Sequence, residues 1–328
     1  MASRLSGSFG SGDSKAFPQE GPLNPIPTTV ALASLLALSA CSSHPAAPAS
    51  AIRVAHLGAE GGDRAGLEAL RASFAAANPG YDVAWTEDLA ALAPADAPRV
   101  AFVQSGDPAS DALGVGDVVL LRPGASQPAP DGCRAVVFTV PEALPAGIPD
   151  VIRPDWDENI TDTPGGCAEE TGAYRRILLT WLPTVGPYVY RALNCHRVRI
   201  TDSFAHYHPR VGGFDEFYLV QMVRPGAVLY TSSKVARMED PGSVTAEEAS
   251  VMIERHELSV GDLVYLPRGT MHRGFGGVLA QVITTPGFKP GAEIGLDHHL
   301  KAINERLGLS GSAALPYRER SADRAVVK

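Results

Sequence analysis

The chain has 328 residues, enough for one large or two ordinary domains, and its 45% hydrophobic and 20% charged residues are typical of a globular protein. Its net charge is −8 and its lysines and arginines form no cluster, so we expect no nucleic-acid partner. No apolar run in the sequence reaches the roughly 18 residues that a membrane-spanning helix needs.

Residues 1–50 are expected to be a leader and linker outside the fold. Residues 1–27 are rich in Ser, Gly and Pro, and the apolar run TTVALASLLALSAC follows them. A short apolar run with small residues at its end is typical of a secretory signal. The ending Leu-Ser-Ala-Cys resembles a bacterial lipobox, which implies that Cys41 is lipidated and anchors an exported protein to a membrane, in the periplasm or at the cell surface. The alternative is an Ala-rich leader, because the nearest positive charge before the run is Lys15.

Residues 51–98 predict a strand, an amphipathic helix and a second strand. Leu67, Leu70 and Phe74 fall on one helical face, and the Asn-Pro-Gly sequence at 78–80 ends the helix. This stretch is similar to the opening of extracellular solute-binding proteins, but too few residues follow to complete such a domain. We therefore expect a small α/β segment packed on the rest of the protein.

A repeat links the two halves of the chain. The segment from Gly116 to Pro141 aligns without a gap with the segment from Gly261 to Pro286, and ten of these 26 paired positions are identical. Self-similarity at a fixed offset indicates a duplicated unit. The counterpart of His272 is Gln127, and no His-x-His occurs in the first half. We expect residues 51–150 to form a degenerate first copy without a metal site; a chance match is the alternative.

Three cysteines remain after the leader, Cys133, Cys167 and Cys195, and none belongs to a CxxC pair. In an exported protein two of them are expected to form a disulfide. Cys167 with Cys195 is the pair to test first, because both precede the motifs described next.

Two short segments in the second half contain the candidate metal ligands. Residues 204–220 (FAHYHPRVGGFDEFYLV) predict a strand in which His206 and His208 share one face, followed by a strand that begins near Glu216. Residues 261–272 (GDLVYLPRGTMH) place a Pro-x-Gly turn just before His272. Three imidazoles and one carboxylate suit iron, manganese, zinc, nickel or copper. The remaining histidines lack a partner at ligand spacing or are expected to be solvated: His44, His56, His196, His256, His298 and His299.

These segments resemble the paired motifs of the cupin superfamily. The family's second motif is matched in spacing at Gly261, Pro267, Gly269 and His272. The first motif is matched at His-x-His, but seven residues separate His208 from Glu216 where three or four are usual, which leaves a choice between Glu216 and Asp215. Glu216 is favoured, because the family's ligand Glu directly precedes an apolar strand.

The resemblance implies a mainly β fold, a cupin-type, jelly-roll-like antiparallel β-barrel over residues 151–295, with residues 296–328 as a C-terminal helix and tail. It implies one divalent metal held by four residues, and a small-molecule ligand or substrate. A metal-dependent enzyme, of the dioxygenase or isomerase type, is the first hypothesis; an exported binding protein without catalysis is the second. Homo-oligomerisation stays open. The expected ligands are His206, His208, Glu216 and His272, and the candidates for supporting roles are Tyr218, Tyr265 and Arg273.

Overall fold

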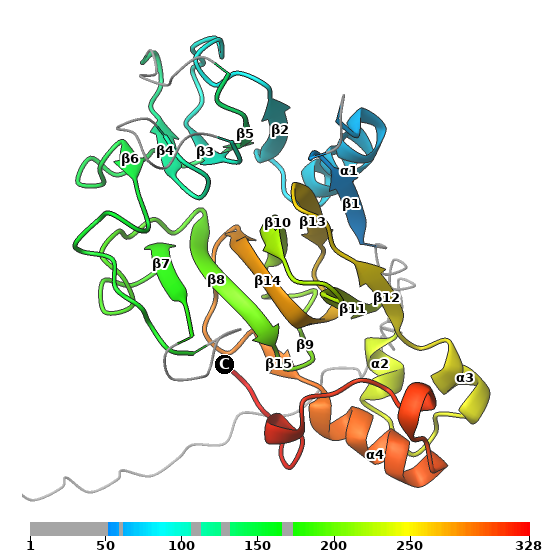
Figure 1. Ribbon diagram of the computed structural model, residues 1–328. Coiled ribbons are helices and arrows are strands. Elements are labelled where there is room, and N and C mark those ends of the chain that lie inside the picture. The colour runs from blue at the N-terminus through cyan, green and yellow to red at the C-terminus, as the bar shows by residue number, and fades with distance from the viewer. Residues whose placement is uncertain (1–51, 59–61, 106–112, 126–131, 166–172) are drawn as a thin grey trace, which may run out of the picture. The chain divides into compact units, whose positions relative to one another are not determined.

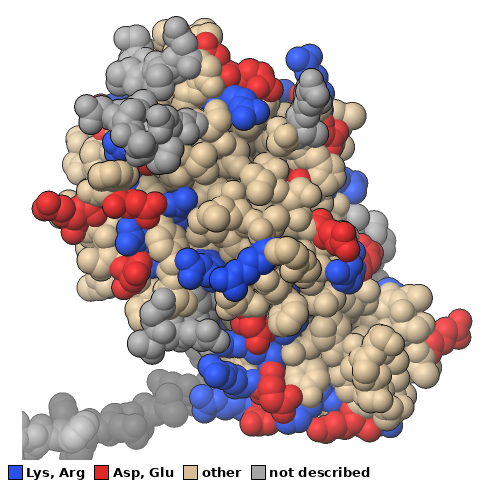
Figure 2. Space-filling view, in the orientation of Figure 1, with Lys and Arg blue, Asp and Glu red and all other residues tan. Residues whose placement is uncertain are grey.

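The computed structural model describes residues 52–58, 62–105, 113–125, 132–165 and 173–328, and strands make up most of the regular structure in these ranges (Figure 1). The mainly β, antiparallel fold predicted from the sequence is confirmed. The leader and Cys41 lie outside the described residues. None of the helices in the described ranges has the length and apolar character needed to cross a membrane. On the face shown in Figure 2, acidic and basic side chains are intermixed.

The larger sheet is organised around one long strand, β14, which pairs with β10 and β11 along one edge and with β8 and β9 along the other. Its ten strands are β1 (Arg53–His56), β7 (Arg175–Leu179), β8 (Asn194–Asp202), β9 (His206–Tyr207), β10 (Asp215–Val223), β11 (Val228–Ser232), β12 (Glu254–Glu257), β13 (Asp262–Leu266), β14 (Met271–Thr285) and β15 (Ile294–Gly295). The register shifts between Phe275 and Val278, where Gly276 and Gly277 have φ of +91° and +106°. This glycine bulge lets β14 bend, so that the sheet curves around an apolar interior.

Alternation along β10 separates the two faces of this sheet. Tyr218 and Val220 lie in the interior cluster with apolar residues of β8, β13 and β14. Phe217 and Leu219 lie on the outer face, in a second cluster. The same alternation places Glu216 on the inner face and Asp215 on the outer face.

The outer face packs against a second sheet and a helix. The second sheet has the order β2-β5-β3-β4-β6, with β2 (Asp82–Thr86), β3 (Arg99–Val103), β4 (Val118–Leu121), β5 (Ala135–Thr139) and β6 (Val151–Ile152). Helix α1 (Arg64–Ala77) buries Leu67, Leu70 and Phe74, as predicted, and Asp63 caps it by accepting a bond from the Gly66 N–H. The ring of Phe74 meets Phe217 edge-on at 4.9 Å between ring centroids. One aromatic core therefore joins the helix and both sheets.

The two sheets share a strand order and a register. The order β6-β4-β3-β5-β2 matches β1-β13-β10-β14-β8. In the smaller sheet Val100 lies opposite Leu120 and Phe138. In the larger sheet Phe217 lies opposite Tyr265 and Ile283. These two residues follow Leu120 and Phe138 by 145 positions, which is the offset of the sequence repeat. This agreement supports the repeat inferred from the sequence, although the first copy is a single five-stranded sheet.

Two boundaries differ from the prediction for the N-terminal half. Strand β1 was expected in an α/β segment, but it pairs with β13 and forms one edge of the larger sheet. The smaller sheet continues through β6, which pairs with β4 and ends at Ile152, two residues past the expected boundary at 150. Both differences arise because strand pairing is non-local and leaves no mark in the spacing of residues.

Short helices cover the end of the larger sheet where β9 and β14 begin. They are α2 (Val235–Met238), α3 (Ala246–Ser250), α4 (Asp297–Leu307) and the 3-10 turns η1 (Gly311–Ala313) and η2 (Glu319–Ser321). Leu300 and Ile303 of α4 share an apolar cluster with Ala205 and Met271. The carboxylate of Asp297, at the start of α4, accepts hydrogen bonds from the backbone N–H groups of Ala205 and Arg318. It thus ties the segment that leads into β9 to the C-terminal tail.

The described part of the chain contains two cysteines, and neither forms a disulfide. Cys195 is a free, buried thiol on β8. Its expected partner, Cys167, lies outside the described residues. Cys133 is also free and buried. Burial raises the pKa of the Cys133 thiol to about 11 and that of Cys195 well above its ordinary value. Both thiols are therefore protonated and unreactive at neutral pH.

Candidate metal centre and adjoining cavity

The two sequence motifs meet because β9 pairs with β14, with His206 directly opposite His272. A second link comes from the turn before β14, where the Gly269 N–H donates to the carbonyl oxygen of His208 at 2.7 Å. Gly269 has φ of +83°, and a Cβ there would lie 2.7 Å from the side chain of Arg210, so the turn requires glycine. The Pro-x-Gly turn predicted from the sequence thus helps to bring the two motifs together.

The three histidines are buried and their rings are fixed by backbone groups. Nδ1 of His206 lies 3.0 Å from the carbonyl oxygen of Phe204, and Nδ1 of His272 lies 3.3 Å from that of Thr270. A carbonyl oxygen only accepts, so Nδ1 carries the proton and Nε2 keeps a lone pair. The Nε2 atoms of His206, His208 and His272 have no hydrogen-bond partner among the described residues. One ring nitrogen from each lies within 4.8 Å of those of the other two.

Glu216 completes the cluster from β10. Its Oε1 lies 3.2 Å from Nε2 of His272, and its Oε2 lies 4.0 Å from Nε2 of His208. An unprotonated imidazole nitrogen and a carboxylate oxygen are both acceptors, and such groups are stable at this separation only with a proton or a cation between them. The donor set of three imidazoles and one carboxylate therefore fits a divalent metal.

Burial controls the ionisation of this cluster. It lowers the pKa of His206 to about 3 and of His272 to about 4, and it lowers the pKa of His208 well below its ordinary value. Burial also raises the pKa of Glu216 to about 7, against the opposing effects of His206 and Tyr218. At neutral pH the imidazoles are neutral, which is the form that coordinates metals.

The choice between Asp215 and Glu216 is decided by the strand. Asp215 is buried on the outer face, where it accepts hydrogen bonds from the Nε of Arg268 at 2.8 Å, from Asn78 at 2.5 Å and from the hydroxyl of Tyr265 at 2.9 Å. Its lone pairs are therefore used in packing α1 and the turn before β14. Glu216, on the inner face, is the carboxylate that meets the histidines.

Of the three residues expected to support the metal centre, only Tyr218 lies on the same face of its strand as the candidate ligand next to it in the motif. Tyr218 faces the interior two residues after Glu216, and it acts to lower the pKa of that carboxyl group. Tyr265 lies on the outer face, stacked on Phe217 at 4.9 Å, so the expectation that it supports the centre is corrected. Arg273 is also on the opposite face of its strand from His272, where its guanidinium donates to Asp202. Period-two alternation explains both corrections.

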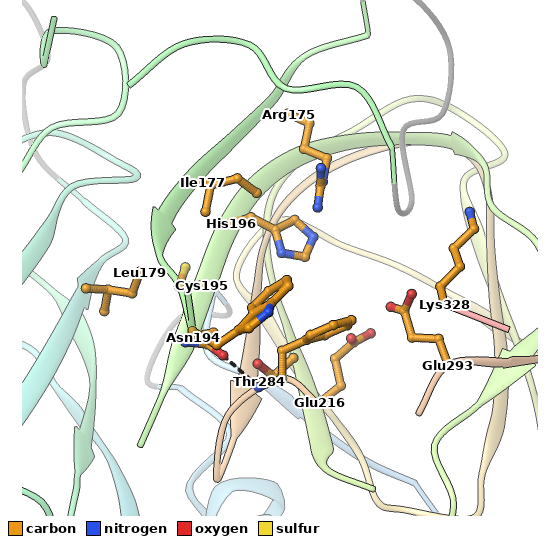
Figure 3. Close-up of a pocket in the computed structure, with 12 residues that line it drawn as sticks. Arg175, Ile177, Leu179, Asn194, Cys195, His196, Glu216, Thr284, Glu293 and Lys328 are labelled. Atoms are coloured by element: carbon orange, nitrogen blue, oxygen red, sulfur yellow. Dashed lines mark hydrogen bonds between the residues drawn. The ribbon is translucent and has the colours of Figure 1, made fainter. Parts of the chain in front are cut away.

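A cavity of about 170 Å³ reaches Glu216 (Figure 3). Strands β7, β8, β10 and β14 supply most of its wall, and the tail of the chain closes it. Its lining residues are Arg175, Ile177, Leu179, Trp181, Asn194, Cys195, His196, Glu216, Thr284, Phe288, Glu293 and Lys328. The side chains of Arg175 and Lys328 enter the end away from Glu216, and the carboxyl groups of Glu293 and Glu216 point toward each other.

Most of this lining was not predicted from the sequence. His196 was set aside for want of a partner at ligand spacing, yet it faces the cavity from β8 (Figure 3). Its Nε2 has no partner among the described residues, and burial holds its pKa well below the ordinary value. Glu293 lies just before β15 and Lys328 lies in the tail, and the backbone N–H of Lys328 donates to the carbonyl oxygen of Glu293 at 3.0 Å. No motif marked these two residues.

Comparison with known proteins finds no family model and no curated protein that matches the chain. Solved structures do match. Procruciferin, an 11S globulin from Brassica napus, is 9% identical, with 76% of this chain and 89% of that chain covered and a TM-score of 0.43. Oxalate decarboxylase from Lactobacillus farciminis in a formate complex is 12% identical, with 74% and 85% covered and a TM-score of 0.41. A protein from Planctomyces limnophilus is 19% identical, with 45% and 98% covered and a TM-score of 0.29. At these scores the likenesses carry no argument about function.

Proposed function

We propose that this chain is a cupin-type protein that holds one divalent metal ion through His206, His208, Glu216 and His272, and that it acts as an enzyme on a small molecule. The observation that supports this most strongly is the convergence of three buried Nε2 atoms and a carboxylate oxygen that have no other partner among the described residues. Iron, manganese, nickel, copper and zinc all suit such a donor set.

A metal at this position would polarise an oxygen of a bound compound, and a redox-active metal would also support chemistry with dioxygen. The chain itself supplies the cavity that brings a compound to Glu216. Glu293 also lines this cavity; burial, with a contribution from the charge of Glu216, raises its pKa to about 8. A carboxyl group that titrates near neutral pH can give or take a proton at its oxygen. This pairing of a donor cluster with a titratable group favours an enzyme over a binding protein.

Elemental analysis of the purified protein tests the metal site. We expect about one divalent metal ion per chain, and we expect His206→Ala combined with His208→Ala to lose it, because two of four ligands are removed. Gln127→Ala is the matched control: it changes the counterpart of His272 in the first half and should leave metal content unchanged. Full metal retention in the double variant, with its circular dichroism unaltered, would contradict the proposed ligand set.

A second experiment separates enzyme from binding protein. The metal-loaded protein is incubated with a panel of small molecules while oxygen uptake and the chemical fate of each compound are followed. Oxygen uptake with an iron, copper or manganese protein would support an oxygenase, and conversion without oxygen would support an isomerase or a related activity. A compound that stabilises the protein and is always recovered unchanged would support the non-catalytic alternative.

We further propose that the protein is exported and attached to a membrane through a lipid on Cys41. This proposal depends on the sequence of the leader alone.

A further inference from the structure

The cavity next to Glu216 has the size of one small molecule. Its volume of about 170 Å³ is close to that of an apolar cavity of about 150 Å³ that holds one benzene molecule. Ile177 and Leu179, two residues apart on β7, supply part of an apolar wall. The rings of Trp181 and Phe288 supply more of it and are stacked with 4.0 Å between their centroids. An occupant therefore needs a compact apolar body.

The cationic side chains in the wall already have partners. Arg175 donates to the carbonyl oxygens of Thr163 at 3.4 Å and Pro164 at 3.3 Å. The ammonium group of Lys328 lies 4.6 Å from the centroid of the Phe204 ring. An anionic ligand would have to displace these contacts before it gained a cation of its own.

A cationic ligand is disfavoured at both ends of the cavity. At one end, burial and then the charge of Arg175 lower the pKa of His196 well below its ordinary value, and a ligand cation there would meet the same repulsion. At the other end, a ligand cation would meet the proposed divalent metal at Glu216. The cavity therefore favours a neutral compound.

Two polar atoms of the wall have no hydrogen-bond partner in the part of the chain that the structure describes. They are Nε2 of His196 and Oγ1 of Thr284, and both are buried. Thr284 of β14 lies opposite Asn194, two residues before His196 on β8, so the two side chains leave the same face of the sheet. Figure 3 shows His196 toward the Arg175 end and Thr284 toward Glu216.

A hydroxyl group is the ligand group that suits Nε2 of His196. A neutral imidazole donates from Nε2 in one tautomer and accepts there in the other. A hydroxyl both donates and accepts, so it pairs with either form. A buried polar atom without a partner is unfavourable, and a ligand that supplies the partner gains affinity in return.

We propose that the cavity binds a small neutral compound whose hydroxyl group pairs with Nε2 of His196 and whose far end faces Thr284 and Glu216. Its apolar body, of about six carbons, packs against Ile177, Leu179 and the stacked aromatic rings. The placement of the hydroxyl depends on His196; only the reactivity of the far end rests on the proposed metal function.

Benzyl alcohol is the probe. Ethylbenzene is its apolar counterpart with the same number of non-hydrogen atoms, and benzoate and benzylamine are its anionic and cationic counterparts. Titrations of the metal-loaded protein, followed by NMR on the ligand signals, give the four dissociation constants. Benzyl alcohol should bind about tenfold or more tightly than either ion, because the ions find no free partner of opposite charge and lose more hydration.

Variants locate the hydroxyl. His196→Phe should weaken benzyl alcohol about fivefold or more relative to ethylbenzene, because it removes the hydrogen bond. His196→Gln keeps a donor and an acceptor and should retain most of the ratio. Thr284→Val removes the polar atom at the other end, and His299→Phe lies on α4 outside the cavity wall; both should leave the ratio unchanged.

The same titrations on chelator-treated protein separate the hydroxyl site from the metal. A ratio that survives metal removal and still depends on His196 would support the proposal, even if the proposed metal function failed. Binding that vanishes with the metal and ignores His196→Phe would mean that the hydroxyl coordinates the metal, and the proposal would be wrong. A ratio that falls in Thr284→Val rather than in His196→Phe, tighter binding of either ion, or no binding of benzyl alcohol at millimolar concentration would also overturn it.

Discussion

Asp215 and Glu216 are adjacent carboxylates with opposite surroundings. Asp215 lies on the outer face of β10 and is neutralised by Arg268 at 2.8 Å. Glu216 lies on the inner face, 3.2 Å from a nitrogen of His272, and burial raises its pKa to about 7. One step along a strand therefore separates a group that stabilises the fold from a group kept available for a ligand.

A matched pair of variants tests this division. Glu216→Gln should lower metal affinity more than 100-fold, a loss beyond that of an outer-shell residue, with little change in the free energy of unfolding of the metal-free protein. Asp215→Asn should lower that free energy by about 2 kcal/mol, because it removes charge-assisted hydrogen bonds, and should retain the metal. Denaturant unfolding and elemental analysis measure both. Metal loss in Asp215→Asn alone would reverse the assignment of the ligand.

The pH dependence of metal binding follows from the same surroundings. In the metal-free protein the pKa of Glu216 is about 7, so its proton must leave when a metal binds below that pH. The pKa values of His206 and His272, about 3 and about 4, keep those imidazoles neutral down to pH 5. Metal affinity should therefore fall about tenfold per pH unit from pH 7 to pH 5 and level off above pH 7.

Competition with a chromophoric chelator across this range measures the slope. One proton per metal is expected from the structure. Three histidines with the ordinary pKa of about 6.5 would add up to three more protons below pH 6. A steep slope of that kind would show that the imidazoles are solvated, and an affinity independent of pH would show that Glu216 is not a ligand.

The histidines of the candidate metal centre could be identified from the sequence, but the cavity could not. His206, His208 and His272 were identifiable because strand alternation and a Pro-x-Gly turn give them local signals. Arg175, Glu293 and Lys328 are brought together only by the tertiary fold, and their local sequences carry no spacing signal. Tyr265 and Arg273 were expected to face the metal centre but do not. Each is next in sequence to a residue that faces the interior, and the sequence alone does not show which face of the strand a residue lies on.

At the scale of elements, one arginine joins α1 to the turn that positions His272. Arg268 donates through Nε to Asp215 and through its terminal nitrogen to the carbonyl oxygen of Ala77 at 3.0 Å and to Asn78 at 2.8 Å. The helix end, β10 and the turn between β13 and β14 thus share one polar cluster. The cluster lies behind the metal centre and fixes its turn from the outer face.

Arg268→Ala should lower the free energy of unfolding by about 3 kcal/mol, because it leaves the buried carboxylate of Asp215 without its cation. Arg199→Ala, an exposed arginine on β8, is the comparison and should change stability by less than about 0.5 kcal/mol. Urea unfolding of both variants gives the two values. Equal stability of the two variants would mean that the ion pair between Arg268 and Asp215 does not stabilise the fold.

Elements with strong local periodicity were predicted well. Helix α1 buries the three residues expected of it, and the helix expected within residues 296–328 is α4. The position of β1 was not predicted, because its pairing with β13 spans some 200 residues of chain. The place of an edge strand in a sheet depends on a partner strand that lies far away in the sequence, so local sequence patterns do not predict it.

At the scale of the whole molecule, the two sheets differ at the position that holds the candidate carboxylate ligand. Arg99 lies opposite Leu121 and Thr139, and Glu216 lies opposite their counterparts Leu266 and Thr284. A basic side chain thus stands where the second copy has its carboxylate. Gln127, the counterpart of His272, lies outside the described residues. A metal held by the first copy would lack its carboxylate ligand, which supports one metal per chain.

The leader gives the last prediction. If Cys41 carries a lipid, the mature chain begins there and keeps 328 − 40 = 288 residues. Expressed in a bacterium, the wild type should partition into detergent, whereas Cys41→Ala should stay in the aqueous phase or keep its leader, because the thiol is the lipid acceptor. Mass spectrometry of the N-terminal peptide distinguishes these results. An intact leader on a cytoplasmic wild-type protein would exclude export. The free thiols of Cys133 and Cys195 fit either compartment, because burial keeps both protonated.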